Sequence, residues 1–477
     1  MTTAHFPNLI GGVLRDGAEW TENRNPADPT DLIGLFAIAS LADLEEAFAA
    51  ARAAQNDWAT ASPQRRFDVL DKVGDLILAR KAELGDLLAR EEGKSLPEAI
   101  GEAARAGMIF KFFAGEALRL NGEILPSVRD GVKVEITREP MGVVSAITPW
   151  NFPIAIPAWK VAPALAYGNA VVLKPAEVAP ACAWKLAEIL VEAGLPAGVF
   201  NLIMGPGRLL GEALCQQADA VSFTGSTGVG RQVLAAATSA GTKVQLEMGG
   251  KNPMIVLDDA DIDLAVNCAL QSAFFSSGQR CTASSRLIVT AGIADQFVNK
   301  LAAACDALVV GDPRDSRTQI GPVASEAQFA SVRAYISGAL GEGAKMVAGG
   351  DEAIPNQGLF IRPTLFDHTT AEMTINREEV FGPVASILRV ADYEAALAAA
   401  NDTEFGLTAG ICTKSLAKAE HFKRHAQAGM VMVNLPTAGV DYHVPFGGRK
   451  ASSFGAREQG SYAREFFTTV KTAYQSA

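Results

Sequence analysis

The chain has 477 residues, of which 49% are hydrophobic and 20% are charged, and its formal net charge at pH 7 is −11. This length suits two or three ordinary domains, and this balance is typical of a soluble globular protein with a large apolar core. An acidic surface repels phosphate backbones, which argues against nucleic acid as a partner. We find no signal-peptide pattern at the N-terminus and no apolar segment near the ~20 residues of a membrane helix, so we expect no membrane association.

The cysteines show no paired spacing and no clustering with the five histidines. They indicate neither a disulfide framework nor a zinc site, so we predict no metal and a reducing, cytoplasmic location. Five of the cysteines would then be small core residues, and one could have a different role. The six are Cys182, Cys215, Cys268, Cys281, Cys305 and Cys412.

The first part of the chain, from Leu41 to Arg119, is rich in Ala, Leu and Glu with helical spacing, which predicts several helices. From Val134 onward, short β-rich runs alternate with amphipathic stretches such as Ala179 to Ala193. This rhythm predicts a doubly wound α/β sheet. Its buried parallel strands are expected at Gly142–Ile147, Ala170–Leu173, Gly198–Ile203 and Ala220–Phe223.

A second series of the same kind predicts a second α/β domain. Two further segments, Ile124 to Glu139 and Phe467 to Tyr474, read as strands outside either series. We expect them to pair with each other or with another subunit. The strands of the second series are expected at Pro253–Leu257, Arg286–Val289, Ala385–Leu388 and Gly429–Asn434.

One thiol differs from the others in its neighbours. Cys281 follows Gly278 and Arg280 and precedes Thr282, so it is not surrounded like a core residue. We interpret the segment as an exposed turn leading into a helix, where a cationic neighbour and the helix dipole would stabilise a thiolate. The residues alone leave two alternatives open, a nucleophile and an ordinary surface cysteine.

A carboxylate stands at a transition between two strands. Glu247 follows Leu246 and precedes Met248 and a Gly-Gly turn. A carboxylate there could have a raised pKa and serve as a general base. The alternative is a solvated loop glutamate.

A rigid turn follows the strand that ends at Ile147. Two prolines and two aromatic residues surround Asn151 in the segment Pro149–Pro153. A firmly held amide donor at a strand end suits an oxyanion site. The alternative is that Asn151 caps the next helix.

Two strand ends carry residues suited to a nucleotide. Lys174 to Glu177 follow one strand, and the glycine-rich segment Phe223–Arg231 follows another and opens a helix. Small residues at Gly225 and Ser226 would let backbone amides approach a pyrophosphate. The spacing departs from the G-x-G-x-x-G fingerprint, so this turn alone is weak evidence.

Taken together and in this order, the motifs resemble the aldehyde dehydrogenase superfamily from about residue 8 to residue 474. The resemblance implies two α/β domains: a Rossmann-like NAD(P)-binding domain from 1–123 and 142–248, and a catalytic domain from 249–465. It also implies oligomerisation strands at 124–141 and 466–477, used in a homodimer or homotetramer. The matching motifs begin at Thr148 (TPWNFP), Lys174 (KPAE), Phe223 (FTGST), Glu247 (EMGGK), Gly278 (GQRC), Glu378 (EEVFGP) and Pro445 (PFGGRK).

By this resemblance, Cys281 attacks the aldehyde carbon to give a thiohemiacetal and, after oxidation, a thioester. The Asn151 amide and the Cys281 backbone N–H would hold the oxyanion. Glu247 would activate the hydrolytic water. The branch of the superfamily that transfers the acyl group to coenzyme A lacks this glutamate, so the resemblance implies a free carboxylic acid as product.

The resemblance also assigns the cofactor residues. A carboxylate at Glu177 favours NAD over NADP, because it would repel the 2′-phosphate, although NADP stays an alternative. Glu458 would contribute to a proton path or start a helix. The cofactor-binding residues expected by similarity are Trp150, Lys174, Glu177, Gly225, Ser226, Glu379 and Phe381.

The segment 439–460 is similar to α-ketoglutaric semialdehyde (2,5-dioxopentanoate) dehydrogenases. Arg280 would offer a cation to a carboxylated substrate, or would pair with an acid of the protein. Succinate semialdehyde dehydrogenase is a close alternative. A broad or aromatic specificity is another, and a non-catalytic binding protein on this fold is a remote one. The substrate pocket would include Phe152, Trp159, Arg280, Thr282 and Tyr442, with Phe275 nearby, or these aromatic residues would be core.

Overall fold

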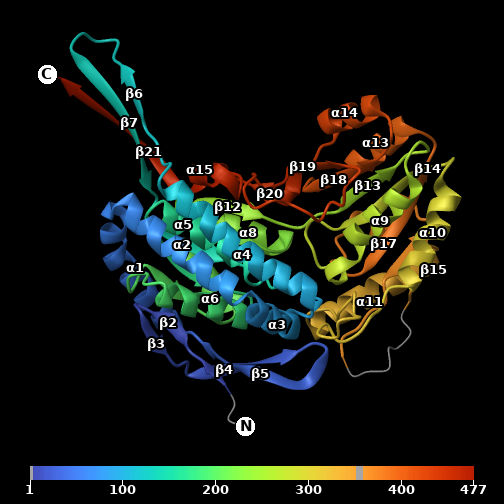
Figure 1. Ribbon diagram of the computed structural model, residues 1–477, viewed down its shortest axis with the longest axis horizontal. Helices are drawn as coiled ribbons and strands as arrows, with labels where there is room; N and C mark the ends of the chain where they lie inside the picture. Colours follow the sequence, from blue (N-terminus) through green and yellow to red (C-terminus); the bar gives the residue numbers. More distant parts are fainter. Residues whose placement is uncertain (1–3, 351–357, 477) are drawn as a thin grey trace.

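The structure, a computed structural model, describes residues 4–350 and 358–476, and these form two α/β lobes with a narrow arm at one end (Figure 1). The first lobe is built on an eight-stranded sheet and the second on a seven-stranded sheet. The predicted fold class is therefore confirmed.

The first lobe contains a mostly parallel sheet in the order β20-β12-β11-β8-β9-β10-β2-β3. The strands β8 to β12 run parallel, whereas β2, β3 and β20 are antiparallel additions at the two edges. The parallel strands are buried from end to end, as apolar runs covered by helices on both faces should be. The strands are β2 (Asn8–Ile10), β3 (Val13–Arg15), β8 (Val143–Ile147), β9 (Ala170–Lys174), β10 (Phe200–Leu202), β11 (Ala220–Thr224), β12 (Lys243–Glu247) and β20 (Ser453–Phe454).

Eight helices of this lobe cover the sheet or pack against one another beside it (Figure 1). Side chains do much of the capping. Ser40 caps the first helix with Asp43 in a capping box, and Ser226 caps the eighth by accepting a bond from Val229 N–H. The helices are α1 (Leu41–Thr60), α2 (Pro63–Ala79), α3 (Lys81–Glu92), α4 (Leu96–Ala117), α5 (Ala155–Ala166), α6 (Ala181–Glu192), α7 (Gly207–Gln217) and α8 (Thr227–Ser239).

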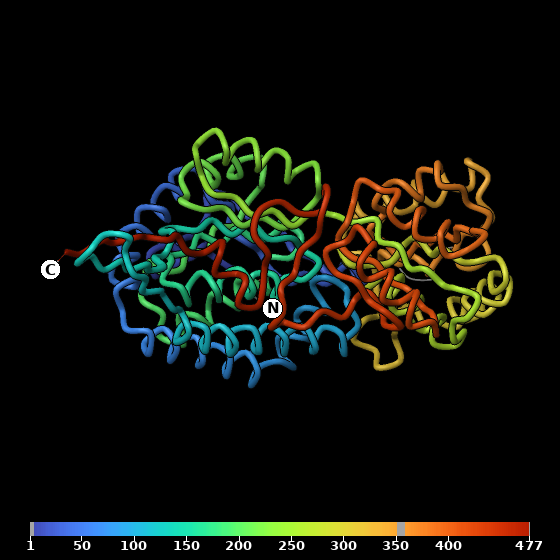
Figure 2. Tube along the Cα trace, turned by 90° about the horizontal axis from the view of Figure 1, so that it is seen from above, coloured from blue at the N-terminus to red at the C-terminus, as the bar shows by residue number. Residues whose placement is uncertain are grey.

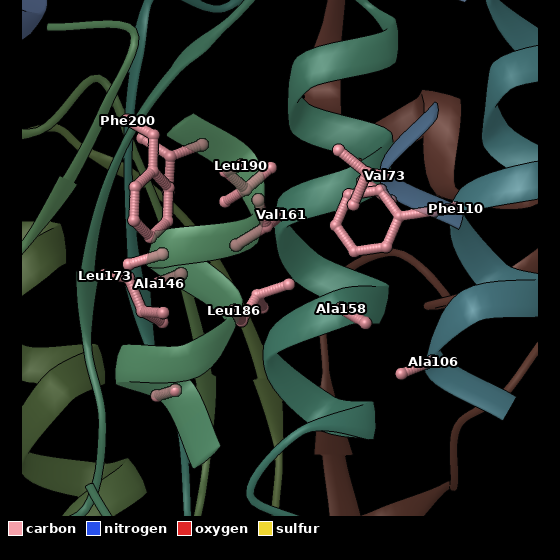
Figure 3. Packing of buried hydrophobic residues seen from close by; sticks show 14 of the residues in the cluster. Val73, Ala106, Phe110, Ala146, Ala158, Val161, Leu173, Leu186, Leu190 and Phe200 are labelled. Carbon is pink, nitrogen blue, oxygen red and sulfur yellow. The ribbon is translucent and has the colours of Figure 1, made fainter. Parts of the chain in front are cut away.

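The core of the first lobe lies between these layers. Figure 3 shows small and large apolar side chains alternating there, with Phe110 of α4 beside Val73 of α2, and Ala106 of α4 facing Ala158 of α5. Small residues at the α4–α5 contact let the two helices approach closely. This close approach brings the neighbouring polar positions on the two helices together.

The second lobe has a seven-stranded sheet in the order β15-β16-β17-β14-β13-β18-β19. Only β15 is antiparallel to its neighbour. The strands are β13 (Asn252–Val256), β14 (Ser284–Thr290), β15 (Lys345–Ala348), β16 (Thr364–Asp367), β17 (Val384–Val390), β18 (Thr408–Cys412) and β19 (Met430–Val433). The helices are α9 (Ile262–Ala273), α10 (Ala294–Asp306), α11 (Glu326–Gly341), α12 (Thr374–Arg377), α13 (Tyr393–Asn401) and α14 (Leu416–His425).

The arm is a three-stranded antiparallel sheet in the order β21-β7-β6. In it, β21 (Thr468–Ser476) pairs along its whole length with β7 (Val132–Pro140), and β6 (Glu123–Pro126) lies on the other side of β7. The two strands expected outside the main series do pair with each other. Figure 2 shows the C-terminal segment, in red, running from the second lobe back over the first before it reaches the arm.

The N-terminal strands, and the return of the C-terminal part of the chain to the first lobe, were not anticipated from the sequence. A small sheet is formed by β1 (His5–Phe6), β5 (Asp28–Ile38) and β4 (Glu19–Asn25). The boundary between the two domains at residue 248 stays a prediction. One strand departs from the predicted division: β20 lies within the predicted catalytic segment but pairs with β12 of the first sheet. Near β20 lie η2 (Lys450–Ser452), η3 (Gly460–Ala463) and α15 (Arg464–Phe467).

Candidate active site

A cleft with an empty volume of about 840 Å³ lies where the two lobes meet. Residues that follow strands β8, β11 and β12 of the first lobe line one side, which is the carboxyl edge of the parallel sheet where α/β proteins bind ligands. The second lobe contributes the other side. The lining includes Trp150, Asn151, Thr224, Gly225, Ser226, Met248, Gly249, Cys281, Gln328, Glu379, Val380 and Phe381.

Cys281 reaches this cleft through a strained turn. The short 3₁₀ helix η1 (Phe275–Gly278) holds Ser276 at φ 52° and Ser277 at φ 53°, in the left-handed region that non-glycine residues seldom adopt. Such strain is often retained where a side chain must be aimed. The expectation that this turn leads into a helix is wrong, because β14 follows it.

The thiol is not held as a thiolate here. Burial, with smaller contributions from the charges of Glu379 and Glu247, raises the pKa of Cys281 to about 12. Arg280 does not compensate for them, because its guanidinium is paired with Glu98 at 2.5 Å. The expected stabilisation by a helix dipole and a cationic neighbour is therefore wrong for this state of the site.

Asn151 is held against the turn that carries the thiol. Its side chain is buried, and its Nδ2 donates to the carbonyl oxygen of Gln279 at 3.0 Å. The backbone oxygen of Asn151 accepts a bond from Lys94 Nζ at 2.7 Å. Helix α5 begins later, at Ala155, without a side-chain cap, so Asn151 does not cap it.

Glu247 is the last residue of β12 and is fully enclosed. Its Oε2 accepts a bond from Ser453 Oγ at 2.5 Å. Burial raises the pKa of Glu247 well above its ordinary value, and the charge of Glu458 adds to this, whereas Ser453, Lys160 and Arg457 oppose it. A solvated loop glutamate is therefore excluded, and a carboxyl that holds its proton more strongly than an ordinary glutamate is indicated.

The cofactor side of the cleft matches the needs of a dinucleotide. Gly225 and Ser226 form the turn between β11 and α8, so the helix N-terminus faces the cleft. Thr224 lines the same turn, and its buried Oγ1 has no hydrogen-bond partner in the part of the chain that the structure describes. An unpaired hydroxyl beside a helix N-terminus suits a phosphate or ribose oxygen, so these residues fit the group.

The nicotinamide-side candidates come from the second lobe. Glu379 accepts a bond from Gly250 N–H at 2.8 Å, and burial raises its pKa to about 7. Phe381 has φ 53° and packs edge-on against Trp150, with ring centroids 5.4 Å apart. These residues join the two lobes across the cleft.

Lys174 and Glu177 lie at the end of β9 but do not line the cleft. Lys174 is buried level with Ile147 of β8, and burial lowers its pKa. Glu177 is exposed and accepts a bond from Gly207 N–H at the start of α7. Because β9 pairs with β8, the residues at and after the end of β9 lie next to the strand that leads to Asn151.

Comparison with known proteins decides the family. Residues 14–473 match the model of the aldehyde dehydrogenase family. The chain belongs to this family.

Relatives and solved structures agree with this assignment. The chain is 43% identical over 477 residues to an α-ketoglutaric semialdehyde dehydrogenase of Bacillus subtilis, covering 98% of each. It is 43% identical over 478 residues to an α-ketoglutarate semialdehyde dehydrogenase of Haloferax volcanii, again covering 98% of each. A betaine aldehyde dehydrogenase of Staphylococcus aureus in complex with NAD⁺ has a TM-score of 0.96, at 32% identity, covering 98% of this chain and 96% of that one. The protein is an NAD(P)-dependent enzyme that oxidises an aldehyde.

The residues expected in the substrate pocket of this aldehyde dehydrogenase do not form one group. The Phe152 ring lies 3.8 Å from Lys94 Nζ, and Tyr442 packs on Phe112 of α4. Thr282 is buried, and its carbonyl oxygen accepts a bond from Thr437 Oγ1 at 2.8 Å. Of the two alternatives for Arg280, pairing with an acid of the protein is the one that the structure shows.

Trp159 belongs to the core of the first lobe, against which Phe152 and Tyr442 also pack. It is 5% exposed, packs on Phe446 with centroids 5.4 Å apart, and leaves its indole N–H without a partner. Phe275 belongs to η1 and packs against the core of the second lobe.

Sequence reasoning missed a buried polar chain behind Glu247. Lys160 Nζ is bonded to Glu458 and donates to Ser222 Oγ at 2.8 Å, and this hydroxyl bonds to Gln245 Oε1 at 3.0 Å. Glu458 therefore does not start a helix. A signal existed, because Lys160 is the one charged residue of the otherwise apolar helix α5.

No helix among the described residues has both the length and the apolar character needed to cross a bilayer.

Proposed function

We propose that this aldehyde dehydrogenase oxidises α-ketoglutaric semialdehyde (2,5-dioxopentanoate) to 2-oxoglutarate. The observation that carries the proposal is the cleft in which Cys281 lies beside Asn151 and Glu379. Relatives that bear this substrate in their names are 43% identical to the chain over nearly its whole length.

The chemistry follows from the residues at the end of the cleft. The Cys281 sulfur adds to the aldehyde carbon, and its proton passes to a nearby base or to water. The second hydrogen of Asn151 Nδ2, together with the Cys281 backbone N–H, binds the oxyanion; one such donor is worth about 3–4 kcal/mol in the barrier. When bound, the nicotinamide accepts the hydride from this carbon.

The thioester on Cys281 is then hydrolysed. Glu247 in its ionised form takes a proton from a water molecule that attacks the thioester carbon, and the carboxylate product leaves as the thiol is restored. Over the cycle, the aldehyde and water give the carboxylic acid, a hydride that leaves on the cofactor and one proton that is released to solvent. A raised pKa of Glu247 makes this base more effective once it is ionised, and makes the rate of hydrolysis increase as pH rises.

For the cofactor we propose NAD rather than NADP. The exposed carboxylate of Glu177 repels a 2′-phosphate and accepts hydrogen bonds from free ribose hydroxyls. Lys174, beside it on β9, would complete the contact. Glu177→Ala should lower the preference for NAD over NADP, which is measured as the ratio of the kcat/KM values for the two cofactors.

The test of the substrate compares aldehydes at equal, sub-saturating concentrations. Initial NADH formation is measured with α-ketoglutaric semialdehyde, succinate semialdehyde, betaine aldehyde, benzaldehyde and propanal. The proposal expects α-ketoglutaric semialdehyde to lead by about tenfold or more. Equal rates with the uncharged aldehydes, or a lead by betaine aldehyde or succinate semialdehyde, would overturn it. Cys281→Ala should abolish activity on every substrate, and its retention would overturn the mechanism.

We also propose that the protein works in the cytoplasm as a homodimer or homotetramer through the arm. In the arm, β21 is an edge strand with free backbone groups, and Val470 and Tyr474 on it are exposed. Val470→Lys should lower the mass measured by light scattering, whereas an unchanged mass would show that the strand is not an interface.

A further inference from the structure

Among the described residues, three side chains near the α4–α5 contact have buried hydrogen-bond donor atoms without an acceptor. They are the Nε of Arg105, the Nε1 of Trp159 and the Nε2 of Gln459. Buried polar groups are rarely left unpaired in native proteins. All three atoms are donors, so the set is complementary to a group that carries several acceptor oxygens.

The three side chains belong to one cluster. Arg105 Nη2 donates to Gln459 Oε1 at 3.3 Å, and the guanidinium carbon lies 5.9 Å from the centre of the Trp159 ring. Arg105 and Trp159 are the sequence neighbours of Ala106 and Ala158, which face one another across the two helices in Figure 3.

Gln459 is held firmly in this cluster. It is fully buried and has φ 58°, which places an ordinary side chain in a strained backbone conformation. The preceding residue, Glu458, is fixed by Lys160, the residue that follows Trp159. The cluster is therefore held in place both by the backbone at Gln459 and by the ion pair between Lys160 and Glu458.

The charge of Arg105 is not neutralised by a direct partner. Within residues 4–350 and 358–476 it forms no salt bridge, and Glu102, one turn earlier on α4, is paired with Lys94 at 2.6 Å. Burial lowers the pKa of Arg105, while the charges of Glu102, Asp441 and Cys281 raise it. An arginine keeps its positive charge under such opposing influences, because its ordinary pKa is above 12. Ile156, one turn before Trp159 on α5, lines the cleft that contains Cys281, so the cluster lies close to the reaction site.

We propose that Arg105, Trp159 and Gln459 bind the carboxylate end of the substrate while its aldehyde end reacts at Cys281. A 2-oxo acid offers three acceptor oxygens at that end, two on the carboxylate and one on the ketone. This inference rests on the proposed function and names the residues that determine its specificity. A substrate with a quaternary ammonium group would be repelled by Arg105, and an uncharged aldehyde would leave the donors unpaired.

Three five-carbon aldehydes separate the contributions. They are α-ketoglutaric semialdehyde, glutaric semialdehyde, which lacks the ketone, and pentanal, which lacks the carboxylate as well. For Arg105→Met we expect kcat/KM to fall by about 100-fold for the two carboxylated aldehydes and to stay within about twofold for pentanal. Arg105→Lys should restore part of the loss. Trp159→Phe keeps a ring but removes one donor, and should cost about tenfold with the carboxylated aldehydes only.

A matched control removes another cation from the same helix. Lys111→Met, on α4, breaks contacts with Asp71 and Asp75 outside the cluster, and should leave the ratio of the three kcat/KM values unchanged. Product inhibition by 2-oxoglutarate should weaken in Arg105→Met and not in Lys111→Met. Binding of NAD, followed by protein fluorescence, should be unchanged in both variants and reports that they are folded.

Two results would have different meanings. If the wild type prefers carboxylated aldehydes and Arg105→Met keeps that preference, the carboxylate is bound elsewhere and this inference is wrong while the proposed function stands. If Arg105→Met lowers kcat/KM equally for all three aldehydes, the residue is structural, and the inference is again wrong. If the wild type itself shows no preference, the proposed substrate is wrong.

Discussion

The side-chain nitrogen of Asn151 donates a 3.0 Å hydrogen bond to the carbonyl oxygen of Gln279, two residues before Cys281. Asn151 follows β8 of the first lobe, and Gln279 belongs to the turn of the second lobe. The bond therefore fixes the proposed oxyanion donor to the turn that carries the nucleophile, across the junction of the lobes. On the other side, Lys94 holds the Asn151 backbone oxygen.

Asn151→Ala should lower kcat by about 100- to 1,000-fold and change KM little, because an oxyanion donor acts mainly in the transition state. The loss is measured by steady-state kinetics with the preferred aldehyde. Binding of NAD should be retained, which distinguishes a lost donor from a collapsed cleft. A large rise in KM with kcat unchanged would contradict this role.

Glu247→Gln should separate the two halves of the reaction. The variant can still form the thioester but lacks the base for hydrolysis, so we expect a rapid burst of about one NADH per active site followed by slow turnover. Added hydroxylamine, which attacks thioesters directly, should raise the steady rate. Absence of a burst together with unchanged turnover would show that another group activates the water.

The pH dependence of the wild type should follow the same carboxyl. Because burial raises the pKa of Glu247, the base is ionised only at higher pH than an ordinary glutamate, and kcat should increase as pH rises through that pKa. Lys160 lowers this pKa, so Lys160→Met should move the acid limb of the kcat profile to higher pH. If the acid limb of the Lys160→Met profile stays at the wild-type pH, the limb reports the ionisation of a group other than Glu247.

Several strands of the two sheets could be predicted from the sequence because each is a short apolar run between turn residues, as in Ala170–Lys174. The site could be predicted only as a set of motifs, and its electrostatics could not. Arg280 contacts Glu98, which is 182 positions away, and such a pairing leaves no local pattern. Arg105 gave no signal either, since one arginine in an amphipathic helix is usually a solvated residue.

Arg280→Met should leave the preference for carboxylated aldehydes unchanged, because this guanidinium is bound by Glu98 and Ser276. The pair is largely buried, so its loss should destabilise the protein by about 1–3 kcal/mol. The measurement is the ratio of kcat/KM for glutaric semialdehyde and pentanal, together with thermal unfolding. A lost preference would show that Arg280 turns toward the substrate when it binds.

A last prediction concerns stability and Glu92. Its carboxylate is fully buried at the end of α3 and lies 3.9 Å from Lys94 Nζ. Burial raises its pKa to about 8, although Lys94 opposes this. A carboxyl whose pKa is raised on folding favours the folded state while it is protonated, and this contribution is lost as pH rises through the folded-state pKa.

Glu92→Gln should therefore be no more stable than the wild type near pH 5, and increasingly more stable toward pH 9. Each unit of pKa shift is worth about 1.4 kcal/mol, so the rise from 4.5 to about 8 is worth about 5 kcal/mol in full, of which about 3 kcal/mol falls between pH 5.5 and 8.5. It is measured as the gap between the thermal unfolding midpoints of variant and wild type at pH 5.5, 7 and 8.5. Glu83→Gln, an exposed change on the same helix, is the control and should show a gap that does not depend on pH. A gap that shrinks with rising pH would mean that ionised Glu92 stabilises the fold through Lys94.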